Sequence, residues 1–235
     1  DFILPIFVTE GKNKKIPIKT MPEVFRYSVD KLGQIVDRAL KLKIPMVAIF
    51  PQTNSGLKDS YGSEALNENN LVCKAIRKIK DKYRNEIGIM TDVALDPYTS
   101  HGHDGILRDK RILNDETIEI LIQQSLLQAQ MGSDVIAPSD MMDGRIGEIR
   151  QELDNNSLKD IKILSYAVKY ASSFYGPFRD AVGSKKSLKG DKKTYQMDFS
   201  NSEEALREVA LDIKEGADLV MVKPCLLYTS DAADE

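Results

Sequence analysis

The sequence predicts an α/β fold of the (β/α)8-barrel type, with about six of the eight strands visible. Apolar runs alternate with amphipathic helical patterns, which indicates repeated βα units and a parallel sheet. The apolar runs are continuous rather than alternating, as expected for strands that are buried on both faces. Chemically capable polar residues follow almost every run, which favours a barrel, where the strand ends meet on one face. A doubly wound sheet is disfavoured because the sequence contains no glycine-rich phosphate turn.

Each predicted element can be assigned to a segment of the chain. Strands are expected at residues 2–8, 46–50, 87–95, 134–137, 161–168 and 219–222. Helices are expected near residues 29–42, 66–83, 115–131 and 202–215. These elements place residues 1–224 in one incomplete barrel domain.

The first and last predicted strands of this incomplete barrel are expected to lack a neighbouring strand on one side. A parallel barrel loses its edges only when the last strand pairs with the first. With six strands, segments 2–8 and 219–222 are therefore expected to be open apolar edges. Residues 225–235, "CLLYTSDAADE", are interpreted as a non-native tail, because they resemble a translated sequencing adapter.

The composition argues against several classes of function. The 33 Lys and Arg residues and 36 Asp and Glu residues leave a net charge of −3, so nothing indicates binding to nucleic acid or a membrane. No apolar run approaches the ~18 residues of a membrane span. Two cysteines form no disulfide framework, which predicts the reducing cytoplasm. Because the chain does not begin with Met, the alternative is a longer protein with an N-terminal targeting segment.

Two lysines stand at the ends of apolar strands. Lys169 follows the run 163–168, and Lys223 follows the run 219–222. A buried amine loses its charge more easily, and neighbouring lysines lower each other's pKa. A neutral amine attacks ketones to form a Schiff base, so two such lysines, about 3–7 Å apart, indicate covalent catalysis. The alternative is a pair of strand-end cations that reach solvent.

Four motifs resemble one enzyme family. They are "DVALDPYTSHGHDG", "APSDMMDGRIGEIR", "KYASSFYGPFRDA" and "MVKP", and they occur in the order of the porphobilinogen synthase (5-aminolevulinate dehydratase) family. The resemblance implies a barrel that joins two 5-aminolevulinate molecules into porphobilinogen, an early step of tetrapyrrole biosynthesis. It also implies self-association into a homo-octamer.

The resemblance also implies roles for the residues that could carry the reaction. Lys169 and Lys223 match the two Schiff-base lysines, and Lys223 would hold the substrate whose amine stays free. Asp92 matches an aspartate that assists proton transfer. Ser139 lies with Asp140 on the same rim, where capping of the strand end is the alternative role.

A second group of residues resembles the family's substrate clamp. The segment 183–193, "GSKKSLKGDKK", matches its active-site lid, although a solvated basic surface is the alternative. The Arg179 guanidinium suits a carboxylate. Tyr175 and Phe178 would wall the pocket, with ordinary core packing as the alternative. The remaining substrate-binding candidates are Lys192, which is arginine in some members, and Gln196.

The motif at residues 92–105 bears on metal binding. Zinc-dependent relatives have three cysteines where this chain has Ala94, Asp96 and Asp104, so zinc is not expected. A weakly held Mg²⁺, a monovalent cation or no metal at all remains open for the two carboxylates. His101 and His103 match no ligand position and are interpreted as loop histidines.

Glu208 is the candidate ligand of a different metal ion. It lies in the predicted helix 202–215, and magnesium-stimulated members of the family bind an allosteric Mg²⁺ near such a glutamate. A solvated helix face is the alternative interpretation.

Two other functional hypotheses compete with this one. A class I aldolase shares the fold and needs only one Schiff-base lysine, so the second lysine argues against it. A non-catalytic barrel fragment is compatible with the six visible strands, and the chain by itself is expected to be inactive.

Overall fold

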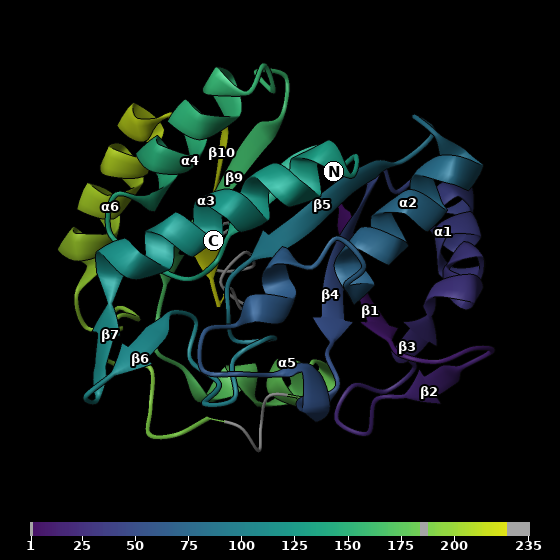
Figure 1. Cartoon of the computed structure of the whole chain (residues 1–235), viewed down its shortest axis with the longest axis horizontal. Coiled ribbons are helices and arrows are strands. Elements are labelled where there is room, and N and C mark those ends of the chain that lie inside the picture. Colours follow the sequence, from purple (N-terminus) through teal and green to yellow (C-terminus); the bar gives the residue numbers. More distant parts are fainter. Residues whose placement is uncertain (1, 184–187, 225–235) are drawn as a thin grey trace, which may run out of the picture.

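The computed structural model describes residues 2–183 and 188–224, and it places a curved, mostly parallel sheet inside a ring of helices (Figure 1). The sheet has eight strands in the order β10-β9-β8-β5-β4-β1-β3-β2. The strands are β1 (Ile3–Thr9), β2 (Lys15–Pro17), β3 (Phe25–Ser28), β4 (Met46–Gln52), β5 (Gly88–Val93), β8 (Val135–Pro138), β9 (Lys162–Lys169) and β10 (Leu219–Lys223). Strands β6 (Ile106–Arg108) and β7 (Arg111–Leu113) form a separate hairpin.

The helices connect successive parallel strands. The α-helices are α1 (Leu32–Lys41), α2 (Leu71–Tyr83), α3 (Asn114–Gln130), α4 (Arg145–Asn155), α5 (Gly176–Ala181) and α6 (Ser202–Glu215). Short 3-10 helices occupy Val29–Lys31, Ser55–Leu57, Ser63–Leu66 and Ser173–Tyr175. This alternation confirms the predicted barrel-type α/β fold.

All six predicted strands are present, with small changes at their ends. Strand β5 ends at Val93, so Ala94 and Leu95 belong to the loop that follows it. Helix α2 begins at Leu71 rather than near residue 66, because Asn70 caps it. Lys169 and Lys223 are the last residues of their strands rather than the first residues beyond them.

The prediction of an open edge at residues 2–8 was wrong for the carboxyl end of this segment, whereas residues 3–6 have no strand on that side among the described residues. Strand β3 pairs in parallel with the carboxyl end of β1, and β2 pairs with β3 in the opposite direction. Both strands are too short to stand out in the apolar pattern. Strand β10 does end the sheet on its side, and Leu219, Val220 and Val222 are exposed there. No pairing within residues 2–183 and 188–224 closes the sheet. The tail at 225–235 lies outside the described residues.

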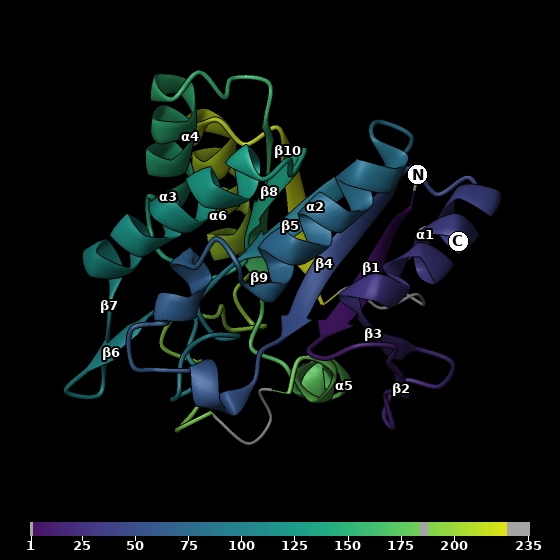
Figure 2. The same ribbon diagram turned by 45° about the vertical axis from the view of Figure 1, so that its right-hand side comes forward.

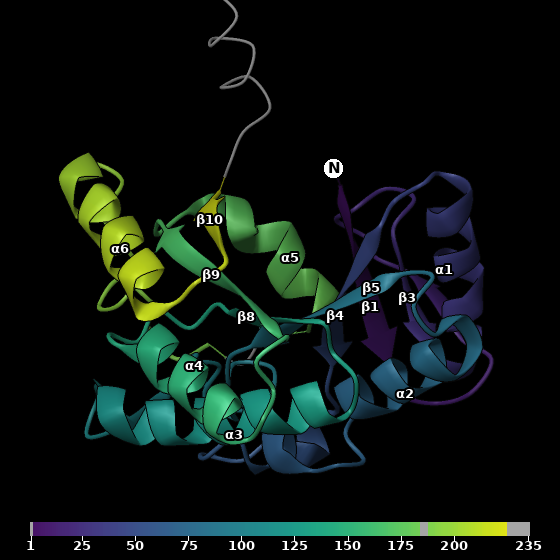
Figure 3. The ribbon, with the colours of Figure 1, turned by 90° about the horizontal axis from the view of Figure 1, so that it is seen from above.

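Two apolar layers surround the sheet. Helices α1 to α4 and α6 lie along its convex side in Figure 3, and two buried clusters fill the space between these helices and the strands. A third cluster fills the concave side, with Phe7, Phe50, Met90 and Tyr166 from four strands.

Helix α5 lies across the carboxyl ends of the strands in Figure 2, and its Phe178 ring packs 4.9 Å from the ring of Phe50, centroid to centroid. The interior is therefore packed, and the space for chemistry lies at this end of the sheet. Within the part of the chain that the structure describes, no helix is both long and apolar enough to cross a membrane.

The caps of helices α2 and α6 offer a matched test of burial. Asn70 is 1 % exposed; its side chain accepts from Cys73 N at 2.8 Å and donates to Ala65 O at 3.2 Å. Asn201 caps α6 in the same way but is exposed. We expect Asn70→Ala to lower the free energy of unfolding by about 2 kcal/mol, and Asn201→Ala by about 0.5–1 kcal/mol. Urea unfolding measures both values, and equal losses would contradict this account.

Candidate active site

The two strand-end lysines are neighbours across the sheet. Strands β9 and β10 pair in parallel, and their register makes Lys223 the partner of Lys169. Both side chains line one pocket at the carboxyl ends of the strands. The structure therefore brings together the two amines whose proximity the sequence predicted.

Lys223 lies among aromatic rings. Its Nζ is 4.5 Å from the ring centroid of Phe178, 5.3 Å from that of Tyr166 and 5.6 Å from that of Tyr175. Burial and, second, the charge of Lys169 lower the pKa of Lys223 to about 8, although nearby carboxylates act in the opposite direction. An appreciable fraction of this amine is therefore neutral near pH 7 to 8.

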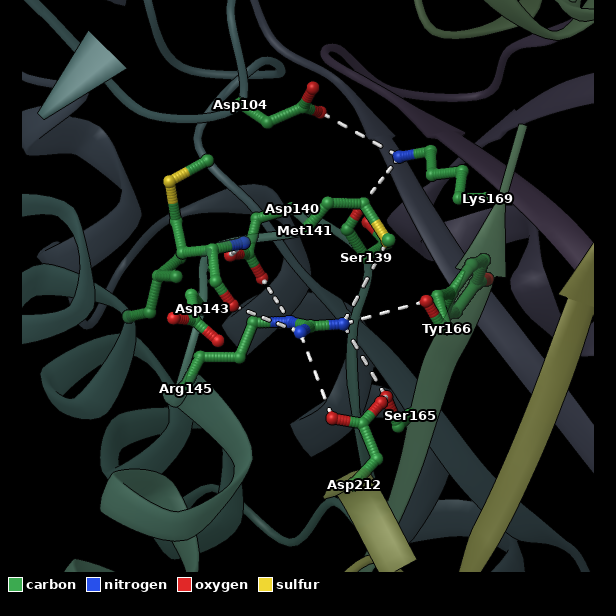
Figure 4. Close-up of polar contacts among 12 residues, drawn as sticks. Asp104, Ser139, Asp140, Met141, Asp143, Arg145, Ser165, Tyr166, Lys169 and Asp212 are labelled. Carbon is green, nitrogen blue, oxygen red and sulfur yellow. Dashed lines mark hydrogen bonds and ion pairs between the residues drawn. The ribbon is translucent and has the colours of Figure 1, made fainter. Parts of the chain in front are cut away.

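Lys169 has polar partners instead of rings. It is 8 % exposed, and its Nζ donates a hydrogen bond to the backbone carbonyl of Ser139 (Figure 4). Its Nζ also lies 3.9 Å from Asp104 Oδ1. The two lysines therefore differ: one amine is held by a carbonyl and a carboxylate, and the other lies in an aromatic pocket.

Asp92 lies on β5 and lines the same pocket as the two lysines. Burial and, second, the charge of Asp96 raise its pKa to about 6, although a hydrogen bond from Ser139 and the two lysines act in the opposite direction. Behind it, the buried Gln128 on α3 donates to the backbone carbonyl of Asp92 at 3.2 Å. A carboxyl group with a pKa near 6 can accept and return a proton close to neutral pH.

Asp96, Asp104 and Lys192 form a buried charge cluster. Lys192 Nζ lies 3.3 Å from Asp96 Oδ2 and 2.9 Å from Asp104 Oδ2. Burial alone would raise the pKa of Asp104, but Lys192 and Lys169 hold it at about 2. Burial raises the pKa of Asp96 despite the lysine beside it. Lys192 keeps a raised pKa, because the two carboxylates outweigh its burial.

This cluster does not fit a zinc ion. Its donors are two carboxylates, and an ammonium group already lies against both of them. The methyl side chain of Ala94 cannot act as a third ligand. In residues 2–183 and 188–224, no group of three or more His, Cys, Asp or Glu side chains could hold a metal ion.

The remaining predicted substrate contacts line the same pocket. Arg179 belongs to α5, and its guanidinium carbon lies 6.0 Å from the Tyr175 ring centroid. Gln196 is buried, and its backbone N–H donates to Lys192 O at 2.9 Å, which fixes the turn that carries Lys192. Eleven of the twelve predicted site residues therefore line one pocket, and their roles stay predictions.

The twelfth residue, Glu208, does not line the pocket. It is half-buried on α6. Burial raises its pKa, and the charge of Asp212 raises it further, against a lowering effect of Arg145. Glu208 thus lies in a separate acidic region beside α4.

The two histidines fasten the basic segment to the body of the protein. His103 Nδ1 contacts Tyr195 Oη at 3.0 Å, and His103 Nε2 contacts Lys189 O at 2.8 Å. Lys189 N also donates to His101 O at 3.0 Å. These contacts agree with their interpretation as loop histidines. Residues 184–187 of the predicted lid lie outside the described part of the chain.

The sequence analysis missed three side chains of this region. Phe50 and Tyr166 line the pocket, and the Tyr195 hydroxyl oxygen accepts a hydrogen bond from Asp104 N at 3.4 Å. Tyr166 could have been found by alternation, because Leu164 and Tyr166 both lie in the concave cluster. Nothing in the sequence indicated that Tyr195 lies beside Asp104.

The chain is similar to known proteins over nearly its whole length. Residues 1–232 match the family model described as delta-aminolevulinic acid dehydratase. A protein of that name from Bradyrhizobium diazoefficiens is 59% identical over 97% of this chain and 64% of its own length. One from Methanothermus sociabilis is 50% identical over 97% of this chain and 70% of its own length.

A solved structure shows the same fold. It is the delta-aminolevulinic acid dehydratase (porphobilinogen synthase) of Toxoplasma gondii, in complex with the reaction product porphobilinogen. The TM-score is 0.93 at 44% identity, over 99% of this chain and 66% of that one. This chain thus spans about two thirds of the length of these relatives, and it belongs to the delta-aminolevulinic acid dehydratase family.

Proposed function

We propose that this chain carries the Schiff-base half of a porphobilinogen synthase site, which condenses two 5-aminolevulinate molecules into porphobilinogen. The observation that supports this most strongly is the pairing of Lys169 with Lys223 across two strands, at one pocket. Each molecule of 5-aminolevulinate has one ketone, so two substrates require two amines. A site with both lysines at its floor meets that requirement.

The first chemical step follows from the state of each amine. The neutral Nζ of Lys223 attacks the ketone carbon, and loss of one water molecule leaves an imine. Lys169 reacts in the same way with the second ketone, once its amine has lost a proton. Asp92, with a pKa of about 6, is the group we assign to accept and return protons between the two substrates.

The substrate carboxylates need cationic partners. Arg179 makes no ion pair among the described residues, so its planar fork is available to a carboxylate at the pocket rim. Lys192 is held by Asp96 and Asp104. We assign it to the carboxylate of the second substrate, which would bind the ammonium group beside these two aspartates or in place of one of them. Gln196 and Ser139 provide neutral hydrogen bonds beside these two cations.

A class I aldolase is the competing function, and the two functions differ in the number of reactive lysines. An aldolase would form an imine at one lysine only. Lys223 lies among aromatic rings, and the amine of Lys169 is held by a backbone carbonyl. Both amines therefore have specific surroundings in the pocket, which favours the reaction with two substrates.

Borohydride trapping tests this assignment. We expect 5-aminolevulinate and borohydride to leave reduced adducts on Lys169 and Lys223, identified by peptide mass spectrometry. Turnover is measured in a chimera in which residues 1–224 replace the matching segment of the Bradyrhizobium relative. Lys223→Met should lower turnover by roughly a thousandfold or more, because the nucleophile is lost. Lys78→Met, which removes an exposed lysine on α2 outside the pocket, is the control. An adduct at one lysine only would support the aldolase instead.

The pH dependence of trapping tests the electrostatic coupling of the two amines. A cation beside Lys223 lowers its pKa, so removal of the Lys169 charge should raise it. In Lys169→Met, the pH midpoint for adduct formation at Lys223 should therefore move upward from about 8, towards but not reaching 10.5, because burial remains. A midpoint that stays fixed or falls would show that the amines are not coupled.

We propose further that Mg²⁺, rather than zinc, activates the enzyme, at Glu208. Enzymes of this family depend on a metal ion. Glu208 lies near the carboxylates of Asp143, Asp212 and Glu215, which raise its pKa together with burial. Mg²⁺ keeps several of its waters and needs only one or two carboxylates, so this acidic region suits it. The bound ion would stabilise this region, and we derive no catalytic step through it.

A single substitution tests the magnesium proposal. Glu208→Gln in the chimera should raise the Mg²⁺ concentration for half-maximal activation by about tenfold or more, because a half-buried carboxylate ligand of the proposed site is removed. Glu203→Gln changes an exposed acid on the same helix and should leave that concentration in place. Activation that requires Zn²⁺, or that is equal in both variants, would contradict the proposal.

The homo-octamer implied by the resemblance also stays a prediction.

A further inference from the structure

A buried ionic cluster lies directly beneath Lys169. It consists of Asp140, Arg145, Ser165 and Asp212, and all four side chains are almost completely buried (Figure 4). Arg145 Nε lies 3.3 Å from Asp140 Oδ1, and Arg145 Nη1 lies 4.0 Å from Asp212 Oδ1. Ser165 Oγ donates to Asp212 Oδ2 at 2.5 Å. We call this group the Arg145 cluster.

The cluster joins three elements that surround Lys169. Arg145 begins helix α4, Asp212 belongs to α6, and Ser165 lies on β9, four residues before Lys169. The guanidinium also donates to the carbonyl of Met142 at 3.0 Å, and its other nitrogen lies 3.5 Å from the carbonyl of Tyr166. One side chain thus spans the loop after β8, the strand of Lys169 and the helical layer.

The loop after β8 has a backbone that needs such support. Met141 has a φ of 72°, in the left-handed region that bulky residues rarely adopt. Asp140 Oδ2 accepts from Met142 N at 2.8 Å and so fixes the turn around Met141. A strained backbone of this kind persists only where the surrounding structure holds it in place. Here the contacts of Asp140 and Arg145 hold the loop in place.

This loop carries the atom that holds Lys169. The residue before Asp140 is Ser139, and its carbonyl accepts the hydrogen bond from Lys169 Nζ. Ser139 is also tied to β5, because its backbone N–H donates to Val93 O at 3.0 Å. The direction of this carbonyl therefore depends on β5 on one side and on the Asp140 turn on the other.

The cluster is costly as a purely structural device. Burial raises the pKa of Asp140 to about 6 even with Arg145 beside it. Apolar side chains often fill such a space with equal or greater stability, so buried ionic groups are weak evidence for a role in stability alone. Unlike apolar packing, ionic contacts and hydrogen bonds fix the position and direction of the groups that they join.

We propose that Asp140 and Arg145 are positioning residues for the Schiff-base reaction of Lys169, and that they act through the carbonyl of Ser139. This inference rests on the proposed function. Loss of the cluster lets the loop relax and the carbonyl turn, so the Lys169 amine loses its fixed direction. Lys223 lies on a different strand, among aromatic rings, and keeps its own surroundings.

Trapping resolved by residue tests this directly. Asp140→Asn keeps the shape of the side chain but removes its charge. We expect the rate of adduct formation at Lys169 to fall by about tenfold or more, because small misplacements of reacting groups are costly, while the rate at Lys223 changes by less than about threefold. Arg145→Met should act in the same way, and Arg145→Lys should restore part of the rate because it restores the charge.

The controls separate positioning from damage to the fold. Asp154→Asn removes the partner of Arg150 on the outer side of α4 and should leave both rates in place. If Asp140→Asn does not fold, Ser165→Ala tests the same cluster through the loss of one hydrogen bond. The 235-residue chain and the chimera are both assayed, with 5-aminolevulinate and borohydride.

Each outcome has a definite meaning. Selective loss at Lys169 supports the inference. Equal losses at both lysines show a general effect on the fold and overturn it, as does an unchanged rate at Lys169 in a folded variant. Absence of adducts at both lysines in the unsubstituted chimera would instead refute the proposed function.

Discussion

The register between β9 and β10 is the constraint on which the site depends. It makes Lys223 the partner of Lys169 at the carboxyl ends of two parallel strands. A shift by one residue would turn one of these side chains to the other face of the sheet. The apolar residues before Lys169 pack into the buried layers on the two sides of β9, and Met221 of β10 packs against the concave cluster. A register shift between Val220 and Val222 brings Lys223 opposite Lys169.

Two buried amines at this point require charge compensation, and the surrounding residues provide it unequally. Asp104 lies near Lys169 and Lys192, so those two cations are paired. Lys223 has rings around it, and no carboxylate of the described residues lies within ion-pair distance of its amine, whose pKa falls to about 8. A single pocket thus holds one lysine beside a carboxylate and one lysine among aromatic rings. This difference suits a reaction in which two identical substrates must play different parts.

Much of the fold and the site could be predicted from the sequence, because both lie where patterns are strong. Long apolar runs gave all six main strands, and residues at strand ends gave the pocket. The short strands β2 and β3 were missed, since three or four residues form no recognisable pattern. Helix α4 was missed because its apolar face is short, with Ile146, Ile149 and Leu153 as its buried apolar residues.

The contacts beneath the site could not be predicted in the same way. Arg145 lies in a motif that was noticed, but a sequence does not show that its guanidinium reaches Asp140 and Asp212 in the interior. The same holds for Lys192, whose two carboxylate partners are 96 and 88 positions away along the chain, at Asp96 and Asp104. Such partners are set by how the loops return to the rim, and apolar periodicity carries no information about that path.

The most direct test of the central claim is a titration of the Lys223 amine by nuclear magnetic resonance, in protein labelled at the lysine side chains. The signal is assigned by its absence in Lys223→Met. Because Lys223 is half-buried among aromatic rings and lies beside a second lysine, the account predicts a midpoint at about 8. A midpoint near the ordinary 10.5 of a solvated lysine would contradict the claim that this pair of strands prepares an amine for attack on a ketone.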